Sequence, residues 1–377
     1  MDGKGDRMKI RIVTFQRADN YGAVLQCYAL FSYIKRLNLD TKVLDYRNPY
    51  IESQYSIIPE NGKIKKKLTY IIKNLLPSYK WQFLRKKRFE SFRKLIEFTD
   101  SKWKQELKKD GVMCDLLISG SDQVLNPDIT NGIDDVYFLN IPCNAIRASY
   151  GASIGSLNSQ YVRSETFLDK LSNIDFLSVR EQDASDYIKK TLGKNVVQCV
   201  DPTLLLEKKE WDEIIENTQY ESAPEKYILL YYLEKNQNLI EVAEKIAEIK
   251  KIPILYFNKK TKLNCESKFC GDAGPLEFIW LIKNASIIIT SSFHASVFSF
   301  IYEKKVCIMT HSKTGARVAS LAKLFNGQDF ICSSVDDAVN KLYIKCDYDQ
   351  KFLKLMRNQS TEYIKYIIKK AEEKNES

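Results

Sequence analysis

The sequence predicts an α/β fold with two parallel-sheet domains that face a cleft. Short apolar segments rich in β-branched residues, such as residues 9–15, alternate with segments of helical spacing, such as residues 23–37. This alternation occurs in two blocks, which a polar, proline-containing stretch separates at residues 218–225. A chain of 377 residues is also long enough to bury two substantial cores. We therefore expect each block to form a Rossmann-like domain.

The two blocks set the expected domain boundaries. We expect an N-terminal α/β domain over residues 1–217, with a basic helical insertion at about residues 60–110. Residues 218–225 are the expected linker, and residues 226–347 the expected C-terminal α/β domain. A long amphipathic helix is expected over residues 348–377, and packing back on the N-terminal domain is one option for it.

The first domain is expected to begin with a strand–helix–strand unit formed by residues 9–15, 23–37 and 41–46. The turn after the first strand contains a single glycine, Gly22, and so lacks the Gly-x-Gly-x-x-Gly pattern of dinucleotide-binding loops. Further strands are expected at residues 115–119, 145–150, 176–180 and 195–200, and helices at residues 162–171, 183–192 and 211–217.

The second domain is expected to continue the same alternation. Pro275 suits the first turn of a helix that ends near residue 285, because its missing N–H is no loss there. The apolar run at residues 286–290 is short and β-branched, which is typical of a strand buried on both faces. Other strands are expected at residues 227–232, 253–257 and 305–309, and other helices at residues 239–249, from residue 292 through 301, and through 321–324.

The strand at residues 286–290 and the helix after it form the strongest candidate site. Ser291 and Ser292 have N-cap chemistry, and His294, one of two histidines in the chain, falls in the first helical turn. A helix that starts at the carboxyl end of a buried parallel strand is where open α/β sheets bind ligands. Its N–H groups and dipole favour an anion. The alternative is that Ser292 is only a cap and His294 an ordinary polar residue.

The end of the strand at residues 115–119 is a second candidate. Gly120 would allow backbone N–H groups to approach a ligand, and Asp122 would project from the carboxyl end of the strand. The alternative for Asp122 is an Asx turn that caps the next segment.

Arg180 is the candidate cation of the first domain. It leaves a buried strand, where a guanidinium is well placed to bind a carboxylate or a phosphate through two hydrogen bonds. The alternative is an ion pair with Glu181 or Asp183. Asp201, which precedes a proline, is expected to act as a structural cap.

The net charge of +10 is concentrated in one segment. Residues 60–110 contain sixteen Lys or Arg and six acidic residues, interleaved with aromatic and aliphatic side chains. Helices that rest on an anionic membrane surface have this composition, and so does a helical pair whose basic side faces water. Nucleic acid is not expected as a partner, because no recognised binding module accompanies the charge.

Cysteine usage and hydropathy favour a reducing cytoplasm, and the basic segment adds the option of peripheral binding at the inner face of the membrane. The nine cysteines form no Cys-x-x-Cys pair, and Cys265 and Cys270 have no second pair to complete a zinc site. No run approaches eighteen apolar residues, and the amino terminus lacks the apolar core of a secretory signal.

Five segments of the chain carry recognisable motifs, and together they span roughly residues 9–330. They are the segment that contains Ser292-Phe293-His294, and Asn20–Gln26, Ser119–Val124, Ser178–Glu181 and Asp201–Leu206. In this order they resemble the polysaccharide pyruvyl transferase family, in the branch with a Ser-Phe-His step. Many family members carry an arginine two residues before the histidine, where this chain has Ser292.

The resemblance implies a glycosyltransferase-B-like architecture and a defined reaction. A pyruvyl group would pass from phosphoenolpyruvate to a sugar or lipid-linked oligosaccharide, forming a ketal during capsular or exopolysaccharide biosynthesis. No cofactor or metal is implied. The implied catalytic residues are His294, as acid, base or phosphate ligand, and Asp122, which would orient or deprotonate the acceptor. The implied donor-binding residues are Arg180, Ser291, Ser292, Phe293 and Arg317, and the implied acceptor or cleft residues are Asn20, Gly22, Gln26, Gly120 and Ser121.

Two other functions stay open. A nucleotide-sugar-dependent glycosyltransferase would share the two-domain cleft and the anion-binding helix. A non-catalytic scaffold of a polysaccharide assembly complex would use the basic segment to sit at the membrane.

Overall fold

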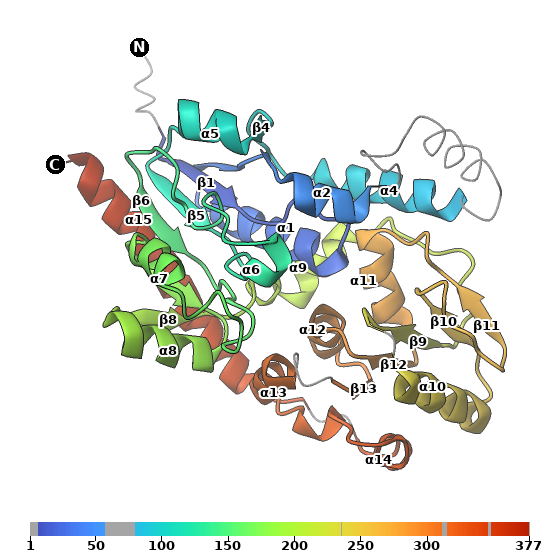
Figure 1. Cartoon of the computed structure of the whole chain (residues 1–377). Coiled ribbons are helices and arrows are strands. Elements are labelled where there is room, and N and C mark those ends of the chain that lie inside the picture. The colour runs from blue at the N-terminus through green and yellow to red at the C-terminus, as the bar shows by residue number, and fades with distance from the viewer. Residues whose placement is uncertain (1–6, 57–79, 235, 311–314, 346–347, 377) are drawn as a thin grey trace. The chain divides into compact units, whose positions relative to one another are not determined.

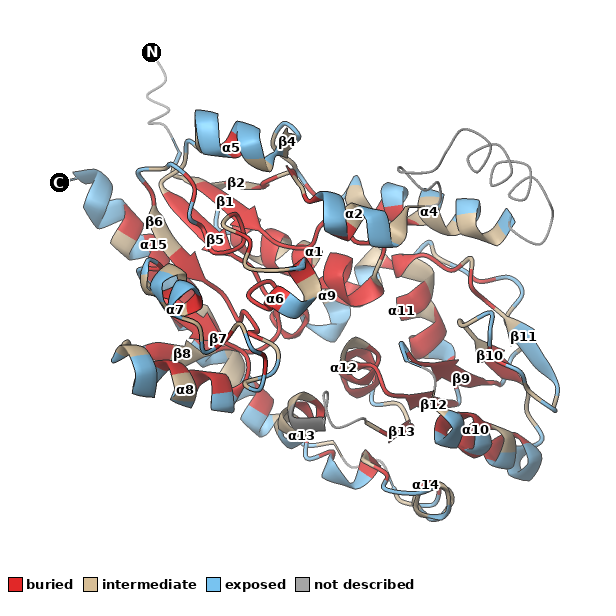
Figure 2. Ribbon diagram, viewed as in Figure 1, coloured by how far each residue is buried: buried red, intermediate tan, exposed pale blue. Residues whose placement is uncertain are grey.

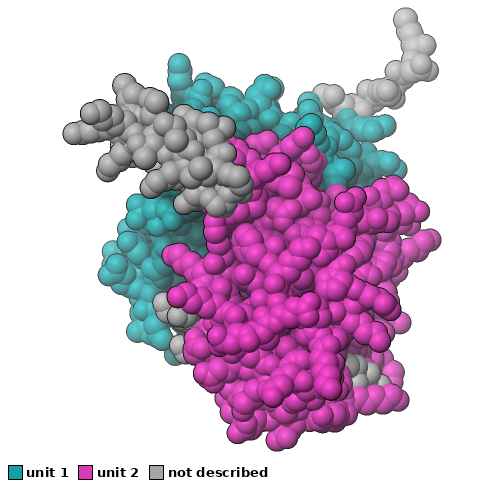
Figure 3. All heavy atoms as spheres, turned by 90° about the vertical axis from the view of Figure 1, so that its right-hand side faces the viewer, with its two compact units in different colours: residues 1–67, 93–206, 356–377 teal, residues 68–92, 207–355 magenta. Residues whose placement is uncertain are grey.

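The computed structural model describes residues 7–56, 80–234, 236–310, 315–345 and 348–376 (Figure 1). The chain forms two compact units (Figure 3). Unit 1 comprises the described residues of Met1–Lys67, Arg93–Leu206 and Met356–Ser377, and unit 2 those of Leu68–Phe92 and Glu207–Leu355. In each unit the buried residues gather on the strands and on the helix faces turned toward them (Figure 2).

Unit 1 is built around a four-stranded parallel sheet with the strand order β2-β1-β5-β6. The register places Ile12 opposite both Val43 and Ile118, and all three side chains are buried. Single parallel bridges, such as Ala152–Val179, link β6 and the residues after it to the pair β7-β8. Because every pair is parallel, the carboxyl ends of these strands lie along one edge. The strands are β1 (Lys9–Val13), β2 (Asp40–Val43), β5 (Leu116–Ser119), β6 (Ile146–Ser149), β7 (Leu177–Val179) and β8 (Val196–Gln198).

The helices of unit 1 follow from strong local signals. Asn20 caps α1 by accepting a hydrogen bond from the Ala23 N–H at 3.3 Å, and Val24, Leu25 and Leu30 of this helix are fully buried. The helices are α1 (Tyr21–Lys35), α2 (Pro49–Tyr55), α5 (Lys104–Asp110), α6 (Pro127–Thr130), α7 (Glu165–Ser172), α8 (Gln182–Leu192) and the 3₁₀ turn η2 (Pro202–Leu204), and a small parallel pair joins β3 (Tyr46–Arg47) to β4 (Lys102–Trp103).

The C-terminal helix α15 (Lys351–Glu376) contributes most of its length to unit 1. The Tyr363 hydroxyl is buried and donates to the carbonyls of Ser149 and Phe176, at 2.9 and 3.0 Å. The Ser360 hydroxyl accepts from the Val200 N–H at 2.9 Å. These bonds reach backbone groups at the end of β6, just before β7 and just after β8, so the last segment of the chain completes the core of the first unit.

Unit 2 is built around a five-stranded parallel sheet with the strand order β11-β10-β9-β12-β13. β9 and β12 lie at its centre, and every residue of both strands is buried. The strands are β9 (Ile228–Tyr231), β10 (Ile254–Tyr256), β11 (Ser267–Phe269), β12 (Ile287–Thr290) and β13 (Val306–Ile308). The helices are α9 (Lys208–Ile214), α10 (Gln237–Lys250), α11 (Pro275–Asn284), α12 (Phe293–Ile301), α13 (Gly315–Leu324), α14 (Val335–Lys341) and the turn η3 (Gln328–Phe330). The predicted α/β class with parallel sheets is confirmed.

The basic segment is only partly described, because residues 57–79 lie outside the described ranges. Its described part contains α4 (Lys80–Arg93), β4 and α5. Phe89 and Phe92 of α4 are buried, and Arg88 forms ion pairs with Asp272 at 2.8 Å and Glu277 at 3.0 Å within unit 2. These contacts use part of the basic and aromatic surface of α4 inside the fold. No helix in the described part of the chain is long and apolar enough to cross a membrane.

Candidate functional site

The first part of the candidate site is the junction between β12 and α12 in unit 2. The buried hydroxyl of Thr290, at the end of β12, donates to the Tyr231 carbonyl at 2.6 Å and accepts from the Ser292 N–H at 2.9 Å. The Ser292 hydroxyl then accepts from the Ala295 N–H at 3.4 Å and caps the helix. Ser291 and Ser292 are both buried. The turn is therefore fixed by hydrogen bonds on both sides of Ser291.

α12 is anchored in the core along its length. The Ser296 and Ser299 hydroxyls donate to carbonyls one turn earlier, at 2.9 and 2.7 Å, so they need no other partner inside the core. Phe298 is fully buried, and its ring meets the Trp211 ring edge-on with centroids 4.9 Å apart. A helix held this firmly presents its N-terminal N–H groups and its positive dipole end at a fixed place.

His294 lies in the first turn of α12 and is partly buried, as is Phe293 before it. The two rings are perpendicular, with centroids 5.2 Å apart. An imidazole at this position can donate to or accept from a group bound at the helix end. Arg317, on α13 of the same unit, is also partly buried. His311, which the sequence left open as pocket or surface, lies outside the described residues.

The second part of the candidate site is the carboxyl edge of the unit 1 sheet. Gln26 of α1 is fully buried, and its side-chain amide donates to the Thr14 hydroxyl at 2.7 Å and the Ala23 carbonyl at 2.8 Å. The Thr14 hydroxyl donates in turn to the Ser121 carbonyl at 3.3 Å. Gln26 therefore joins the ends of β1 and β5. Its Oε1 atom is buried without a hydrogen-bond partner among the described residues, which is an uncommon state for a polar atom.

Asp122 adopts the left-handed backbone conformation, with φ of 71°. This region is costly for a residue with a side chain and is enriched at functional sites. The Asp122 carboxylate accepts from the next residue's N–H at 2.9 Å, and its carbonyl accepts from the Ser153 N–H at 2.9 Å. The side chain is partly buried. Gly120 precedes this turn and is packed against Thr14, where an added Cβ would approach the Thr14 side chain to 3.2 Å.

Arg180 forms two ion pairs inside unit 1. Its guanidinium donates to Asp201 at 2.7 Å and to Glu181 at 3.1 Å, and its side chain is 7% exposed. Burial lowers the pKa of Arg180, but the charges of Glu181 and Asp201 outweigh burial and raise that pKa above its ordinary value. The ion pair between Arg180 and Glu181, which the sequence offered as an alternative to ligand binding, is present. One cation and two carboxylates leave this cluster with a net charge of −1.

Asp201 is both a helix cap and the ion-pair partner of Arg180, whereas its sequence context predicts only the cap. It caps η2, as expected, by accepting from the N–H and hydroxyl of Thr203 at 3.1 and 2.6 Å. Its other oxygen accepts from Arg180 at 2.7 Å. The Ser121 hydroxyl, which donates to the Gly151 carbonyl at 2.9 Å, lies 3.5 Å from that oxygen. The Asp201 side chain is fully buried, so it ties the ends of β5 and β7 together. Sequence spacing carried no signal for this pair, because 21 residues separate Asp201 from Arg180.

The structure thus places the predicted residues, apart from Arg317 of α13, in two groups, one in each unit. Ser291, Ser292, Phe293 and His294 lie at the carboxyl end of β12. The unit 1 group lies at the ends of β1, β5 and β7. Among the described residues, no group of three His, Cys, Asp or Glu is placed to hold a metal ion. The members of the unit 1 group are Asn20, Gly22, Gln26, Gly120, Ser121, Asp122 and Arg180.

Comparison with known proteins gives a family and a fold. Residues 20–313 match the sequence model of the family described as polysaccharide pyruvyl transferase. A search of curated proteins finds no match. The chain resembles the structure of UDP-GlcNAc 2-epimerase from Methanocaldococcus jannaschii in complex with UDP-GlcNAc and UDP, with a TM-score of 0.55 and 14% identity over 95% of this chain and 99% of that one.

Two further epimerase structures give the same result. UDP-GlcNAc 2-epimerase from Neisseria meningitidis, bound to UDP-GlcNAc, has a TM-score of 0.52 and 13% identity over 96% of this chain and 100% of that one. UDP-N-acetylglucosamine 2-epimerase from Rickettsia bellii has a TM-score of 0.53 and 10% identity over 98% and 99%. At such identities the likeness shows the fold alone, and the predicted glycosyltransferase-B-like fold is confirmed.

Proposed function

Because the chain belongs to the polysaccharide pyruvyl transferase family, we propose that it transfers a pyruvyl group from phosphoenolpyruvate to a sugar. Two hydroxyl oxygens of the sugar form bonds to the second carbon of the donor, and the bond from that carbon to the phosphate oxygen breaks. The methylene carbon gains one proton and becomes a methyl group. Two hydroxyl protons are released: one is matched by the proton that the methylene carbon gains, and the other leaves with inorganic phosphate. The product is a cyclic ketal.

The observation that carries the proposal is the capped N-terminus of α12. Phosphoenolpyruvate has a phosphate and a carboxylate, so its site needs N–H donors and positive charge. The hydrogen bonds from Thr290 and Ser292 fix the backbone at this helix end, and the buried position of Ser291 and Ser292 keeps it from being freely hydrated. Arg317 is the proposed additional cation, in place of the family arginine that Ser292 replaces.

His294 is the proposed acid–base group or phosphate ligand. Its place in the first turn of α12 puts the imidazole beside any anion held by the helix N–H groups. Asp122 is proposed to orient or deprotonate the acceptor, and the hydrogen bond that its carboxylate accepts from the Gln123 N–H at 2.9 Å holds that carboxylate in place. Asn20, Gly22, Gln26, Gly120 and Ser121 are the proposed surroundings of the acceptor.

Arg180 is a proposed donor-binding residue that already has counter-ions. The net charge of −1 in its cluster attracts a doubly anionic donor less than an isolated guanidinium would. Its effect on the Michaelis constant for phosphoenolpyruvate and its effect on the stability of unit 1 therefore need separate measurements.

The test is mass spectrometry of candidate lipid-linked sugars after incubation with the protein and phosphoenolpyruvate. The proposal predicts the mass gain of one pyruvyl ketal, lost in His294→Ala. Incubation with UDP-GlcNAc is the competing arm, because the structurally similar epimerases from Methanocaldococcus jannaschii and Neisseria meningitidis were solved with that ligand. Gain of an N-acetylhexosamine in that arm, with no pyruvyl ketal formed from phosphoenolpyruvate, would reject pyruvyl transfer in favour of a glycosyltransferase.

A matched pair of cap variants tests the role of the helix end. Ser292 caps α12 and Ser334 caps α14 of the same unit, each through a hydroxyl that accepts from the helix backbone. Ser292→Ala and Ser334→Ala are each expected to cost about 1 kcal/mol of stability. Only Ser292→Ala is expected to raise the Michaelis constant for phosphoenolpyruvate. Equal constants in the two variants would remove α12 from the donor site.

A further inference from the structure

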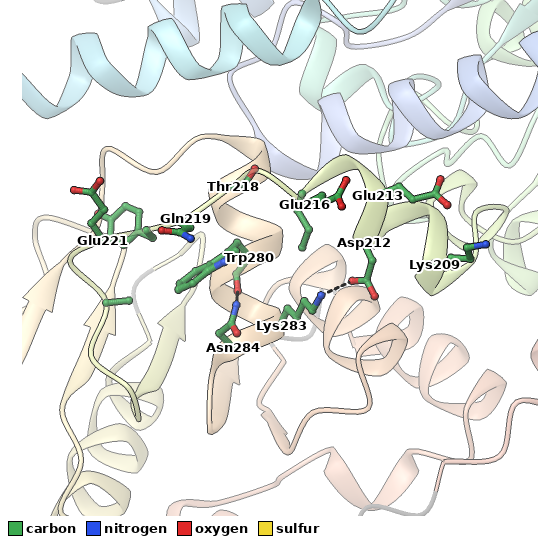
Figure 4. Close-up of a pocket in the computed structure, with 13 residues that line it drawn as sticks. Lys209, Asp212, Glu213, Glu216, Thr218, Gln219, Glu221, Trp280, Lys283 and Asn284 are labelled. Atoms are coloured by element: carbon green, nitrogen blue, oxygen red, sulfur yellow. Dashed lines mark hydrogen bonds and ion pairs between the residues drawn. The ribbon is translucent and has the colours of Figure 1, made fainter.

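A pocket in unit 2 lies apart from the β12–α12 junction. It is bounded by α9 with the segment after it on one side, and by the C-terminal half of α11 on the other (Figure 4). Its volume is about 650 Å³, which is typical of small-molecule sites. Trp280, Lys283 and Asn284 of α11 all line it, because residues spaced by three and four positions share one helix face.

The centre of the pocket is an indole with polar groups around it. Trp280 is partly buried, and within the described residues its ring N–H has no hydrogen-bond partner. The Asn284 amide donates to the Trp280 carbonyl at 2.8 Å, which holds that amide in place and leaves its oxygen as an acceptor. Gln219 adds a second amide from the opposite wall (Figure 4). The pocket thus combines a flat apolar surface with fixed donors and acceptors.

The charge of the pocket is opposite to that of the chain. Four carboxylates and two lysine ammonium groups line it, whereas the whole chain carries +10. Lys283 is paired with Asp212 at 2.8 Å, so Glu213, Glu216 and Glu221 share the pocket lining with one further cation, Lys209. An acidic balance repels phosphates and nucleotides. It suits a ligand with many hydroxyl donors and no negative charge.

We propose that this pocket binds a neutral sugar residue of the acceptor chain, away from the site of reaction. The apolar C–H face of a pyranose ring would lie on the Trp280 indole, and its hydroxyls would donate to the amide and carboxylate oxygens around it. The inference rests on the proposed function for its acceptor class. A second sugar subsite would add affinity for a long acceptor without taking part in the chemistry.

The first experiment measures binding alone, by titrating the protein with chitohexaose and isomaltohexaose while following tryptophan fluorescence. Binding at Trp280 changes the emission, and Trp280→Ala should abolish that change and weaken binding by about tenfold. Trp103→Ala is the matched control, because Trp103 is an exposed indole of unit 1 that packs under Arg47. Glu216→Ala, an exposed position on the pocket wall, should weaken binding without any effect on folding.

The outcomes separate this inference from the proposed function. Sugar binding that depends on Trp280 and Glu216 supports the subsite, whether or not pyruvyl transfer is found. Failure of both hexasaccharides to bind, or equal binding by the Trp280→Ala and Trp103→Ala proteins, overturns it. Binding of hexalysine in place of sugar also overturns it, because the pocket would then recognise a basic peptide. If pyruvyl transfer occurs, Trp280→Ala should raise the Michaelis constant for long acceptors and leave that for phosphoenolpyruvate unchanged.

Discussion

Arg180 provides the sharpest test of how unit 1 holds the ends of its strands. The guanidinium donates to Asp201 at 2.7 Å and to Glu181 at 3.1 Å, and the side chains of Arg180, Asp201 and Glu181 are 7%, 0% and 8% exposed. Replacing Arg180 by alanine leaves two buried carboxylates without their cation. The resulting loss is dominated by the cost of an uncompensated buried charge and much less by the loss of packing.

The expected size of this loss follows from the burial. Removing one partner of a buried ion pair costs about 3–5 kcal/mol. Unit 1 contains roughly 200 residues, for which 1 kcal/mol corresponds to about 2–4 °C, so the melting temperature should fall by roughly 6–20 °C. Asp201→Asn should cost less, because it leaves the Arg180 cation with Glu181. The double variant should lose less than the sum of the single variants, because the two side chains interact directly.

The assay is thermal and urea unfolding of the wild type, the two single variants and the double variant, followed by circular dichroism, with steady-state kinetics on the same preparations. Lys35→Ala is the control within unit 1, because it removes an ion pair with Glu97 whose side chains are 38% and 52% exposed. That change should alter the stability by less than about 1 kcal/mol. If Arg180→Ala loses under about 1 kcal/mol and only the Michaelis constant for phosphoenolpyruvate rises, Arg180 serves the ligand and our structural assignment is wrong.

Three further predictions concern acid stability, thiol reactivity and the core. Burial raises the pKa of Asp135, but hydrogen bonds from Lys108 and Lys170 outweigh it and hold that pKa well below its ordinary value. The ionised Asp135 therefore contributes its full stabilisation above about pH 4, and this contribution is lost as the pH falls further. Asp135→Asn should make the free energy of unfolding less dependent on pH below about pH 4. An unchanged pH dependence would contradict this. Burial raises the pKa of the Cys27 thiol to about 12, so mass spectrometry should show that iodoacetamide at pH 8 leaves Cys27 unmodified in the folded protein and labels it after unfolding. Phe298 is fully buried, so Phe298→Ala should lower the free energy of unfolding by about 3–5 kcal/mol in urea titrations, and a loss below about 1 kcal/mol would show that α12 is loosely packed.

The sequence predicts the central elements of each sheet well, because their signals are local. β12 consists of three isoleucines and a threonine, so it is β-branched at every position, and the serine N-cap of α12 lies two residues after it. β11 was missed because Ser267-Lys268-Phe269 is an edge strand with two exposed residues and no apolar run. α14, which was also missed, is a short helix with a single fully buried residue, Ala338.

The candidate site was predictable only where chemistry and local structure coincide. A serine two residues after an apolar strand predicts the start of a helix, with His294 in its first turn. The structure has this helix, α12, and Ser292 caps it. The ion pair between Arg180 and Asp201 could not be predicted from the sequence, because it depends on how β7 and the segment after β8 meet in space. The buried amide of Gln26 was named through the family resemblance, and its bonds to Thr14 and Ala23 could not be derived from spacing.

The acidic pocket beside Trp280 illustrates the same limit. Its walls come from α9 and its following segment and from α11, which are separated by about sixty residues of chain. In sequence, Trp280 is one apolar residue among several on a helix, and nothing distinguishes it from a core position. The structure identifies it, because the opposite face of α11 packs in the core through Phe278 and Ile282.

The most direct test of the proposed reaction is carbon-13 NMR of phosphoenolpyruvate labelled at its second carbon, incubated with the protein and a sugar acceptor. Pyruvyl transfer predicts that the vinyl carbon signal is replaced by a ketal carbon signal on the sugar, with one inorganic phosphate released for each ketal. His294→Ala should abolish both. Release of phosphate together with free pyruvate, or no change in the donor with any acceptor of the panel, would contradict the proposed function.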